Sequence, residues 1–183
     1  VFFTFHKHEK MLNLKNKIRT IENFPKPGIQ FRDITTLLAD PSSFNEVIER
    51  LADHYSEVQI DYVAGIESRG FIIGAPLSLK LRKGFIPIRK VGKLPGLTYK
   101  VEYDLEYGTD CLEVHKDAIN NGGKVLMVDD LLATGGTMSG GTKLIEKAGG
   151  IVVGFTFVIE LVELKGREKL DKPIFSLITF EGE

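Results

Sequence analysis

The sequence predicts an α/β fold, with an open, mostly parallel twisted sheet flanked by helices. Two short apolar runs, residues 85–88 and 125–128, have the composition of strands buried on both faces of a parallel sheet. Segments with the helical spacing of apolar residues alternate with such runs, as in proteins built from strand-helix units. Polar motifs follow three of the strands, at the edge where ligands bind in open α/β sheets. A chain of 183 residues with 43% hydrophobic residues is expected to form a single domain with its own core.

The first residues are expected to contribute little to the fold. Residues 1–10 mix aromatic and basic side chains without a period, and Met11 is the more natural start. We therefore expect a non-native or disordered extension without a catalytic role, followed by one domain over residues 11–183. Apolar residues then recur with helical spacing and predict a short helix on the rim of the sheet: Leu12, Leu14, Ile18 and Ile21.

The first loop of interest covers residues 24–33. Two prolines and Gly28 exclude a helix and fix an ordered bend that presents Phe31 and Arg32. From the residues alone, Phe31 is also compatible with a place in the core, where phenylalanine is common.

A helix is expected after this loop. Asp40 is suited to cap its amino terminus, and Pro41 is suited to the first helical position. The apolar residues that follow at helical spacing are expected to lie in the core: Phe44, Val47, Ile48, Leu51 and Tyr55.

A second strand is followed by a short polar loop and another helix. The strand is expected over residues 62–66 and the helix over residues 71–83. Ser68 and Arg69 lie in the loop between them. Arg69 is compatible with an ordinary surface charge, but the carboxyl end of a parallel strand is also the edge where ligands bind.

A basic loop follows the strand at residues 85–88. Arg89, Lys90 and Lys93 are three cations within five residues, with glycine and proline close by. Such a run fits a solvated surface, and its place directly after a buried strand also fits a mobile flap that neutralises an anion. We expect the flap to cover residues 90–108.

Acidic residues at every second position predict that the chain continues as an extended strand. Residues 101–108 place Glu102, Asp104 and Glu106 on one face of an extended segment, where acids are ordinarily solvated. Further strands are expected over residues 109–114, 151–161 and 173–180.

The most informative motif spans residues 124–142 and reads as strand, loop and helix. Asp129 and Asp130 interrupt the apolar run where the strand is expected to end. Two ionised side chains beside an apolar strand are costly unless a partner binds them. The next turn offers an anion its backbone amides, two hydroxyls and a helix amino terminus: Ala133, Thr134, Gly135, Gly136 and Thr137. We interpret the motif as a phosphate cradle beside a pair of acids.

Two other nucleotide-binding motifs are excluded for this stretch. No Gly-Lys-Ser or Gly-Lys-Thr closes the turn, as a Walker phosphate loop requires, and Gly-x-Gly-x-x-Gly is absent. Glycine, threonine and aspartate also occur at strand-to-helix junctions simply as turn and capping residues. Gly140 and Gly141 lie where the helix should continue and have no explanation in the sequence, because each costs roughly 1 kcal/mol relative to alanine.

Charge and composition exclude several classes of protein. Lys and Arg number 24 and Asp and Glu 25, so the net charge of −1 gives no general attraction to nucleic acid or an anionic membrane. Cys111 is the only cysteine, which excludes an intrachain disulfide and a cysteine-based zinc cluster, and four scattered histidines argue against an imidazole metal site. We therefore assign no metal ligands. No apolar run reaches the roughly 18 residues of a membrane span and no cleavable signal is apparent, so the cytoplasm is the simplest localisation.

The sequence Val-Asp-Asp-Leu-Leu-Ala-Thr-Gly-Gly-Thr, residues 128–137, resembles the phosphoribosyl pyrophosphate motif of type I phosphoribosyltransferases. Within this family, the residues of the motif most resemble those of the adenine phosphoribosyltransferases. The resemblance implies that Asp129 and Asp130 hold the ribose hydroxyls and that the turn from Ala133 to Thr137 holds the 5-phosphate.

Gly-x-x-Ser-Arg-Gly-Phe, residues 65–71, also matches the family. This match implies that Ser68 and Arg69 contact pyrophosphate, a role that suits the bidentate donors of a guanidinium. The flap is implied to close over pyrophosphate, and the residue matching Arg89 is implied to reach across a dimer interface into the partner's site. The expected pyrophosphate-binding cations of the flap region are Arg89, Lys90 and Lys93.

Pro-Gly-x-x-Phe-Arg-Asp, residues 27–33, extends the resemblance to the base pocket. It implies that Phe31 stacks on adenine and that the backbones of Gln30 and Arg32 read the amino group of the base. Leu161 is implied to close the pocket opposite the stacked ring. Gln30 departs from the small apolar residue common in the family, but recognition through the main chain should preserve specificity.

Leu-Glu-Tyr-Gly, residues 105–108, resembles the end of the family's flap and implies that Glu106 is the general acid or base near the purine. The resemblance runs from about residue 23 to residue 180. It implies an enzyme of purine salvage, a homodimer, that transfers the phosphoribosyl group of phosphoribosyl pyrophosphate to adenine and releases AMP and pyrophosphate. Mg²⁺ is expected to bind mainly through the polyanionic substrate.

Two alternatives stay open at this point. The same transfer to another purine, such as xanthine or hypoxanthine, would differ only in the base pocket. A regulatory protein on the same fold would need an added DNA-binding domain, and the roughly twenty residues before the first loop are too few for a helix-turn-helix unit.

Overall fold

The computed structural model describes residues 13–104 and 108–181, and within Asp104 only the backbone. The chain divides into two compact units, the first ending at Glu46 and the second beginning at Val47. Each unit is described by itself below. The extension expected over residues 1–10 lies outside the described residues.

The first unit is built on a two-stranded antiparallel sheet. Strands β1 and β2 pair with Arg19 opposite Asp33 and Ile21 opposite Phe31. The elements of this unit, in chain order, are the 3₁₀ helix η1 (Leu14–Lys17), β1 (Arg19–Glu22), β2 (Gln30–Asp33), α1 (Thr35–Leu38) and the start of α2 (Pro41–His54).

The helix predicted from Leu12 to Ile21 is wrong beyond its first turn. Within the part of this stretch that the structure describes, which begins at residue 13, only Leu14–Lys17 is helical, as one 3₁₀ turn, and the backbone becomes extended at Ile18. Two β-branched residues follow in β1, where the backbone groups find partners in β2 rather than along a helix. Long-range pairing therefore overrides the local periodicity.

The start of α2 follows the sequence prediction. Pro41 is its first residue, and Asp40 Oδ1 accepts hydrogen bonds from the backbone N–H groups of Ser42 at 3.1 Å and Ser43 at 3.3 Å. The capping prediction for Asp40 is therefore confirmed.

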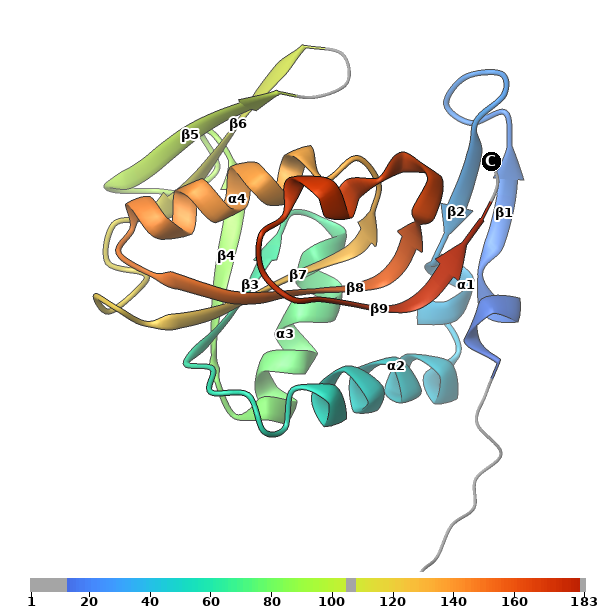
Figure 1. The fold of residues 1–183 in the computed structure, drawn as a ribbon, viewed down its shortest axis with the longest axis horizontal. Helices are drawn as coiled ribbons and strands as arrows, with labels where there is room; N and C mark the ends of the chain where they lie inside the picture. The colour runs from blue at the N-terminus through green and yellow to red at the C-terminus, as the bar shows by residue number, and fades with distance from the viewer. Residues whose placement is uncertain (1–12, 105–107, 182–183) are drawn as a thin grey trace, which may run out of the picture. The chain divides into compact units, whose positions relative to one another are not determined.

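The second unit contains a seven-stranded sheet in the order β5-β6-β4-β3-β7-β8-β9 (Figure 1). Strand β3 pairs in parallel with β4 and β7, and β7, β8 and β9 continue the parallel part. The β5–β6 hairpin is antiparallel and joins the sheet through β4. The strands are β3 (Tyr62–Ile66), β4 (Gly84–Lys90), β5 (Thr98–Asp104), β6 (Thr109–His115), β7 (Lys124–Leu132), β8 (Ile151–Leu161) and β9 (Ile174–Phe180). The mostly parallel sheet predicted from the sequence is confirmed.

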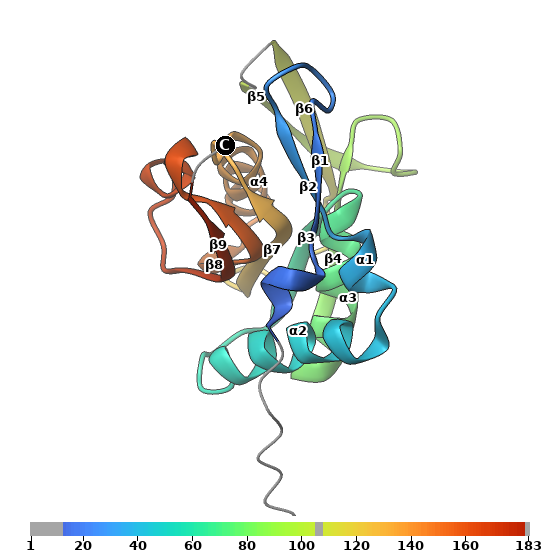
Figure 2. The same ribbon diagram turned by 90° about the vertical axis from the view of Figure 1, so that its right-hand side faces the viewer.

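Helices α3 (Arg69–Leu81) and α4 (Gly136–Lys147) cover opposite faces of the parallel strands (Figures 1 and 2). Helix α3 begins two residues before the predicted start at Phe71. Two 3₁₀ turns, η2 (Val162–Leu164) and η3 (Gly166–Lys169), connect β8 to β9. Among the described residues, no helix combines the length and the apolar composition that crossing a membrane requires.

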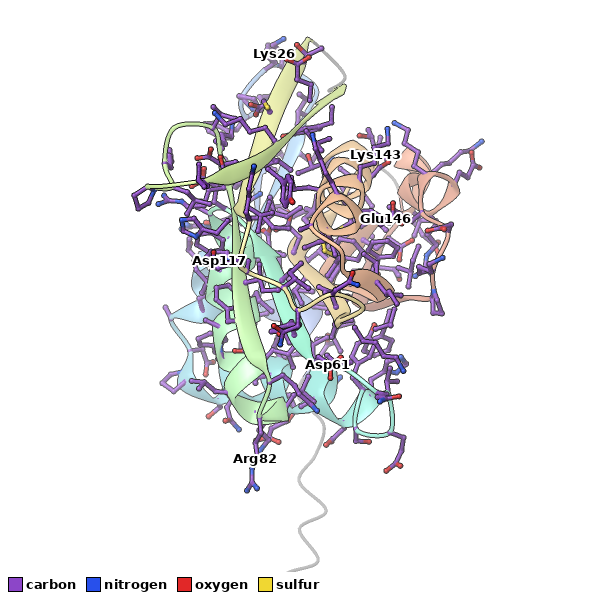
Figure 3. All side chains as sticks on the ribbon, turned by 90° about the vertical axis from the view of Figure 1, so that its left-hand side faces the viewer. Lys26, Asp61, Arg82, Asp117, Lys143 and Glu146 are labelled. Atoms are coloured by element: carbon purple, nitrogen blue, oxygen red, sulfur yellow. The ribbon has the colours of Figure 1, made fainter. Side chains whose placement is uncertain are left out.

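The core of the second unit forms where α4 packs on the sheet. Val125, Leu126, Met127 and Val128 of β7 are completely buried, as the apolar run predicts. Lys143 and Glu146 lie on the exposed face of α4 (Figure 3). Leu144 and Ile145 of the same helix are buried. Asp61, also labelled in Figure 3, joins the amino ends of β3 and β7, because its carboxylate accepts a hydrogen bond of 2.9 Å from the N–H of Lys124.

The structure explains the two glycines inside α4. A Cβ atom on Gly140 would lie 2.7 Å from Cβ of Tyr103, and one on Gly141 would lie 2.8 Å from Cε of Met127. Both contacts are closer than packed carbon atoms allow. The glycines therefore let α4 approach β5 on one side and β7 on the other.

Candidate active site

The two acids of the central motif lie where β3 ends and β7 continues. Strand β3 pairs with β7 as far as Val128, whereas β8 accompanies β7 to Leu132. The prediction that β7 ends at the acids is therefore wrong, because its pairing with β8 carries the strand four residues beyond Val128. This arrangement leaves Asp129 half-buried and Asp130 buried beside the loop that follows β3.

Arg69 approaches this carboxyl pair from the first turn of α3. Its Nε lies 2.8 Å from Oδ2 of Asp130, and Oδ1 of Asp129 accepts a hydrogen bond of 2.9 Å from the N–H of Asp130. Residues 125–137, which flank the acids along the chain, include no lysine or arginine. The parallel pairing of β3 with β7 supplies one, since it brings the carboxyl ends of the two strands to the same edge.

Burial makes the pair resist ionisation. Burial and then the charge of Asp130 raise the pKa of Asp129 well above its usual value, despite the nearby Arg69. Burial also raises the pKa of Asp130, although the charge and hydrogen bond of Arg69 oppose the rise. A ligand that donates hydrogen bonds or brings positive charge would favour the ionised forms.

The turn after β7 forms a cradle in front of α4. Gly135 adopts a left-handed conformation with φ of 77°, and Gly136 is the first residue of α4. A Cβ atom on Gly135 would lie 2.5 Å from the carbonyl oxygen of Gly166 in η3, so both the backbone conformation and the close approach require glycine here. The turn and the acids line a cavity of about 210 Å³ with Arg69, Leu131, Leu132, Met138 and Phe157.

A second cavity of about 430 Å³ adjoins the first and shares four of its residues. The shared residues are Arg69, Asp129, Asp130 and Thr137. Its other lining residues come from β3, β4, β5, β6 and the loop after β3: Ile66, Glu67, Ser68, Lys90, Tyr103, Asp110 and Leu112. The carboxyl pair therefore lies between the turn on one side and the basic loop region on the other.

Lys90 is held at this second cavity by an ion pair. Its Nζ lies 2.8 Å from Oδ2 of Asp110, an interaction that raises the pKa of Lys90 and lowers that of Asp110. The hydroxyl of Tyr103 donates to the same carboxylate at 3.3 Å, and the Thr137 side chain also hydrogen-bonds with Tyr103. The hairpin is thus linked to the cradle through Tyr103.

Arg89 and Lys93 converge on Glu67, the residue that follows β3. Nε and Nη2 of Arg89 donate to Oε2 of Glu67 at 3.1 and 3.0 Å, and Nζ of Lys93 lies 3.6 Å from the same atom. The backbone N–H of Lys90 donates to Oε1 at 2.5 Å. Burial opposes ionisation of Glu67, but these partners outweigh it and lower its pKa. The three predicted cations therefore gather at one edge, each beside a carboxylate.

The predicted base-contacting residues lie on two different units. Gln30, Phe31 and Arg32 form β2 in the first unit, where Phe31 meets Phe24 edge-to-face at 5.2 Å and Arg32 Nη1 donates to Thr20 Oγ1 at 2.6 Å. Leu161 is the last residue of β8 in the second unit. Glu106, the predicted acid or base, lies outside the described residues.

Sequence reasoning missed four residues that shape the site. The sequence contains a pattern that could have identified Glu67, because this carboxylate follows a buried strand and lies two residues before Arg69. No such pattern identifies Tyr103 and Asp110, since their contacts depend on the register of the β5–β6 hairpin. Gly166 supports the turn from a distant loop, which the bidentate pair of Arg167 with Glu160, at 2.6 Å for each bond, holds in place.

The carboxyl groups do not form a cage for a metal ion. Among residues 13–104 and 108–181, no group of three or more His, Cys, Asp or Glu side chains is placed to hold a cation. One or two carboxylates together with substrate phosphates, however, are the usual ligands of Mg²⁺. The site fits an ion that arrives with a phosphorylated ligand.

Comparisons with known proteins agree with this architecture. The family model described as a phosphoribosyl transferase domain matches residues 33–182. An adenine phosphoribosyltransferase of Chloroflexus aurantiacus is 57% identical over 169 residues, covering 92% of this chain and 98% of the relative.

Solved structures show the same fold. The crystal structure of adenine phosphoribosyltransferase from Thermoanaerobacter pseudethanolicus is 53% identical, with a TM-score of 0.89 over 91% of this chain and 98% of that one. The Saccharomyces cerevisiae enzyme, crystallised with an imino-altritol bisphosphate and adenine, is 43% identical, with a TM-score of 0.85 over 90% and 96% of the two chains. The chain therefore belongs to the phosphoribosyl transferase family, among its adenine phosphoribosyltransferases.

Proposed function

We propose that the two adjoining cavities bind phosphoribosyl pyrophosphate and that the enzyme transfers its phosphoribosyl group to adenine, giving AMP and pyrophosphate. The observation that carries the proposal is the pair of acids, one half-buried and one buried, placed between a glycine-bearing cradle and a group of cations. Such a site offers acceptors to sugar hydroxyls and donors to phosphates on either side.

The sugar end of the substrate fits the smaller cavity. Asp129 and Asp130 would accept hydrogen bonds from the ribose hydroxyls, which favours their ionised forms despite burial. The 5-phosphate would accept hydrogen bonds from the backbone and hydroxyls of the turn: Ala133, Thr134, Gly135, Gly136 and Thr137. The amino end of α4 adds a favourable dipole of roughly 0.3 to 1 kcal/mol, so the direct hydrogen bonds supply most of the binding.

The pyrophosphate end fits the larger cavity. Ser68, Arg69 and Lys90 line that cavity, and Arg89 and Lys93 lie beside Glu67, which also lines it. A pyrophosphate group would compete with Glu67 and Asp110 for these cations. Positive charge placed there stabilises the electron pair that stays on the leaving pyrophosphate when its bond to the anomeric carbon breaks.

The residues proposed to contact the base are assigned from the resemblance to the family. A ring nitrogen of adenine attacks the anomeric carbon, and the proton that this nitrogen bears must be removed. We assign that proton transfer to Glu106 and base contacts to Gln30, Phe31, Arg32 and Leu161. The presence of adenine in the Saccharomyces cerevisiae structure supports adenine as the base.

Mg²⁺ completes the proposed reaction. Asp129 and Asp130, which line both cavities, would hold the ion together with phosphate oxygens of the substrate, and the ion would supply positive charge to the leaving pyrophosphate. Calorimetric titration of phosphoribosyl pyrophosphate with and without Mg²⁺ tests this assignment, and equal affinities would contradict it.

We also propose that the enzyme is a homodimer working in the cytoplasm, as a purine salvage role implies. Arg89 pairs with Glu67 of its own chain, so a role in the partner's site would require this ion pair to exchange.

The defining experiment is a product assay with purified protein and Mg²⁺. Phosphoribosyl pyrophosphate is supplied with adenine, hypoxanthine or xanthine, and nucleotide formation is followed by chromatography together with pyrophosphate release. We expect AMP from adenine and little product from the other purines. Absence of AMP would contradict the proposed function, and turnover of hypoxanthine alone would move the assignment to another purine.

A further inference from the structure

Strand β6 carries a buried carboxylate that the proposed reaction does not use. The Glu113 side chain is 2% exposed. Its neighbours in the strand register are Arg89 on β4 and Lys100 on β5, so an acid lies between two cationic residues across three strands. A charged side chain at such a depth needs partners to offset the loss of hydration.

Those partners come from the loop that follows β4. Oε1 of Glu113 accepts hydrogen bonds of 2.9 Å from the backbone N–H groups of both Lys93 and Leu94. Oε2 accepts a bond of 3.2 Å from Thr98 Oγ1 and lies 4.0 Å from Nζ of Lys100. One side chain therefore organises the loop between β4 and β5.

As a result, both the N–H and the carbonyl group of Lys93 are hydrogen-bonded. Its N–H donates to Glu113, and its carbonyl oxygen accepts a bond of 3.4 Å from Arg89 Nη1. Its Nζ then lies 3.6 Å from Oε2 of Glu67, the carboxylate that also binds Arg89. The Glu113 side chain thus holds the backbone position from which the Lys93 ammonium group reaches Glu67.

We propose that Glu113 is a positioning residue for the pyrophosphate end of the active site, acting through the backbone of Lys93. The inference rests on the proposed function, since it assumes that pyrophosphate binds beside Lys93 and Arg89. Glu113 does not touch the substrate. It fixes the loop so that the Lys93 ammonium group is already beside Glu67 and Arg89 when the substrate arrives, which lowers the entropic cost of binding.

The ionisation of Glu113 agrees with this role. Burial opposes its charged form, but the backbone N–H groups of Leu94 and Lys93, together with Thr98, outweigh burial and lower its pKa. Glu113 is therefore ionised at neutral pH, when its hydrogen bonds to the loop are strongest.

Three variants separate these contacts. Glu113→Ala removes all of them, whereas Glu113→Gln keeps one oxygen that can accept from the two backbone N–H groups. Thr98→Val removes only the contact to Oε2. Glu102→Ala, an exposed acid on β5, is the matched control.

The measurement is a set of Michaelis constants for phosphoribosyl pyrophosphate and adenine in the forward reaction and for pyrophosphate in the reverse reaction. We expect Glu113→Ala to raise the constants for both pyrophosphate-containing substrates about tenfold, because binding must then order the loop and the Lys93 side chain, a cost of the size that immobilising one or two side chains carries. The constant for adenine should stay within about twofold, because the loop that Glu113 holds is assigned to pyrophosphate and not to the base, whereas kcat should fall modestly, because the displaced Lys93 also stabilises the leaving pyrophosphate in the transition state. Glu113→Gln should raise the two constants about threefold and Thr98→Val about twofold, and Glu102→Ala should match the wild type.

The outcomes distinguish the inference from the proposed function. Formation of AMP by the wild type establishes the reaction independently of Glu113. The inference is overturned if the variants leave both pyrophosphate-related constants unchanged, or if the adenine constant changes in parallel with them. If Glu113→Ala does not fold, as a thermal melt would show, Glu113→Gln and Thr98→Val carry the same test.

Discussion

The carboxyl pair Asp129 and Asp130 is held in surroundings that oppose its charge. Burial and mutual repulsion raise the pKa of Asp129, and Arg69 provides an opposing charge. Sugar hydroxyls that donate to both groups would favour ionisation. The two acids should therefore ionise more readily in the complex than in the unliganded site, and this difference makes substrate binding depend on pH.

At neutral pH, Asp130→Asn is expected to weaken binding of phosphoribosyl pyrophosphate. It removes a charged acceptor and the partner of Arg69, and a hydrogen bond to a charged group contributes roughly 1.5–3 kcal/mol, so we expect a loss of about tenfold to a hundredfold in affinity. Calorimetric titration measures the change. Asp117→Asn, on an exposed turn that lines neither of the two site cavities, serves as the control, and unchanged affinity in Asp130→Asn would contradict the assigned role.

The same pair predicts a pH dependence in the wild type. The proposed binding mode requires ionised carboxylates, and the folded-state pKa of Asp129 is raised. Affinity for phosphoribosyl pyrophosphate should therefore fall as pH is lowered through that raised value, at a higher pH than an ordinary aspartate would give. In Asp130→Asn the like charge is gone, so the fall should move to lower pH; an unshifted profile would show that another group controls it.

At the scale of single elements, β2 and α1 depend on one buried acid. Asp33 binds the Arg19 side chain of β1 through Nε at 3.1 Å and through Nη2. Its carboxylate also accepts hydrogen bonds from the N–H of Thr35 at 2.9 Å and the hydroxyl of Thr35 at 2.8 Å. These contacts join the two-stranded sheet to the first turn of α1.

The contacts of Asp33 predict a stability difference that depends on pH. The Arg19 hydrogen bond is the main cause that lowers the pKa of Asp33 from 3.8 to about 2. An acid whose pKa is lower in the folded than in the unfolded protein stabilises the fold at pH values above its unfolded pKa. This contribution is lost as pH falls from 3.8 through about 2. Because Arg19 is exposed and partly screened, Asp33→Asn should lower the free energy of unfolding by only about 1 kcal/mol at pH 7. At pH 3 the difference should be smaller.

Urea unfolding at the two pH values tests this prediction. Asp53→Asn is a matched control, because Asp53 is an exposed acid of α2. A difference between wild type and Asp33→Asn that is equal at both pH values would contradict the ionic role of Asp33.

The contact between α4 and β5 is a second test at this scale. Gly140→Ala places a methyl group 2.7 Å from Cβ and Cγ of Tyr103, atoms near the backbone that cannot move aside cheaply. The gain in helix propensity is about 1 kcal/mol, whereas overpacking costs about 1–3 kcal/mol, so the net effect should be destabilising or close to neutral.

Displacement of Tyr103 should also disturb its hydrogen bond with Thr137 in the cradle. We therefore expect a weaker affinity for ribose 5-phosphate in Gly140→Ala, measured by calorimetry, while Lys143→Ala on the exposed face of α4 leaves it unchanged. A more stable Gly140→Ala protein with full affinity would show that β5 moves freely from the helix.

At the scale of the whole molecule, the proposed homodimer gives a direct prediction. Light scattering coupled to size-exclusion chromatography should report twice the 20.4 kDa of the chain at assay concentrations. The mass of a single chain would contradict the dimer and would leave Arg89 acting only beside its own Glu67. The product assay separates this result from the reaction itself.

The sequence by itself determined the class of fold and the chemistry of the central motif. The run over residues 125–128 predicts a buried strand because four consecutive apolar side chains suit burial on both faces, and all four are buried. The two acids and the glycine-bearing turn predict an anion site because their chemistry is local and contiguous. The same local reasoning failed at Ile21, where strand pairing replaced the expected helix.

Only the tertiary structure decided which side chains accompany this motif. Arg69 reaches Asp130 because β3 and β7 are parallel neighbours, although 61 positions separate the two residues in the chain numbering. Glu113 binds the backbone of Lys93 across a strand register that no local pattern encodes. Pairing between distant strands arises from the hydrogen bonds and packing of the whole sheet, so the partners of the acids and of the basic loop follow from the fold.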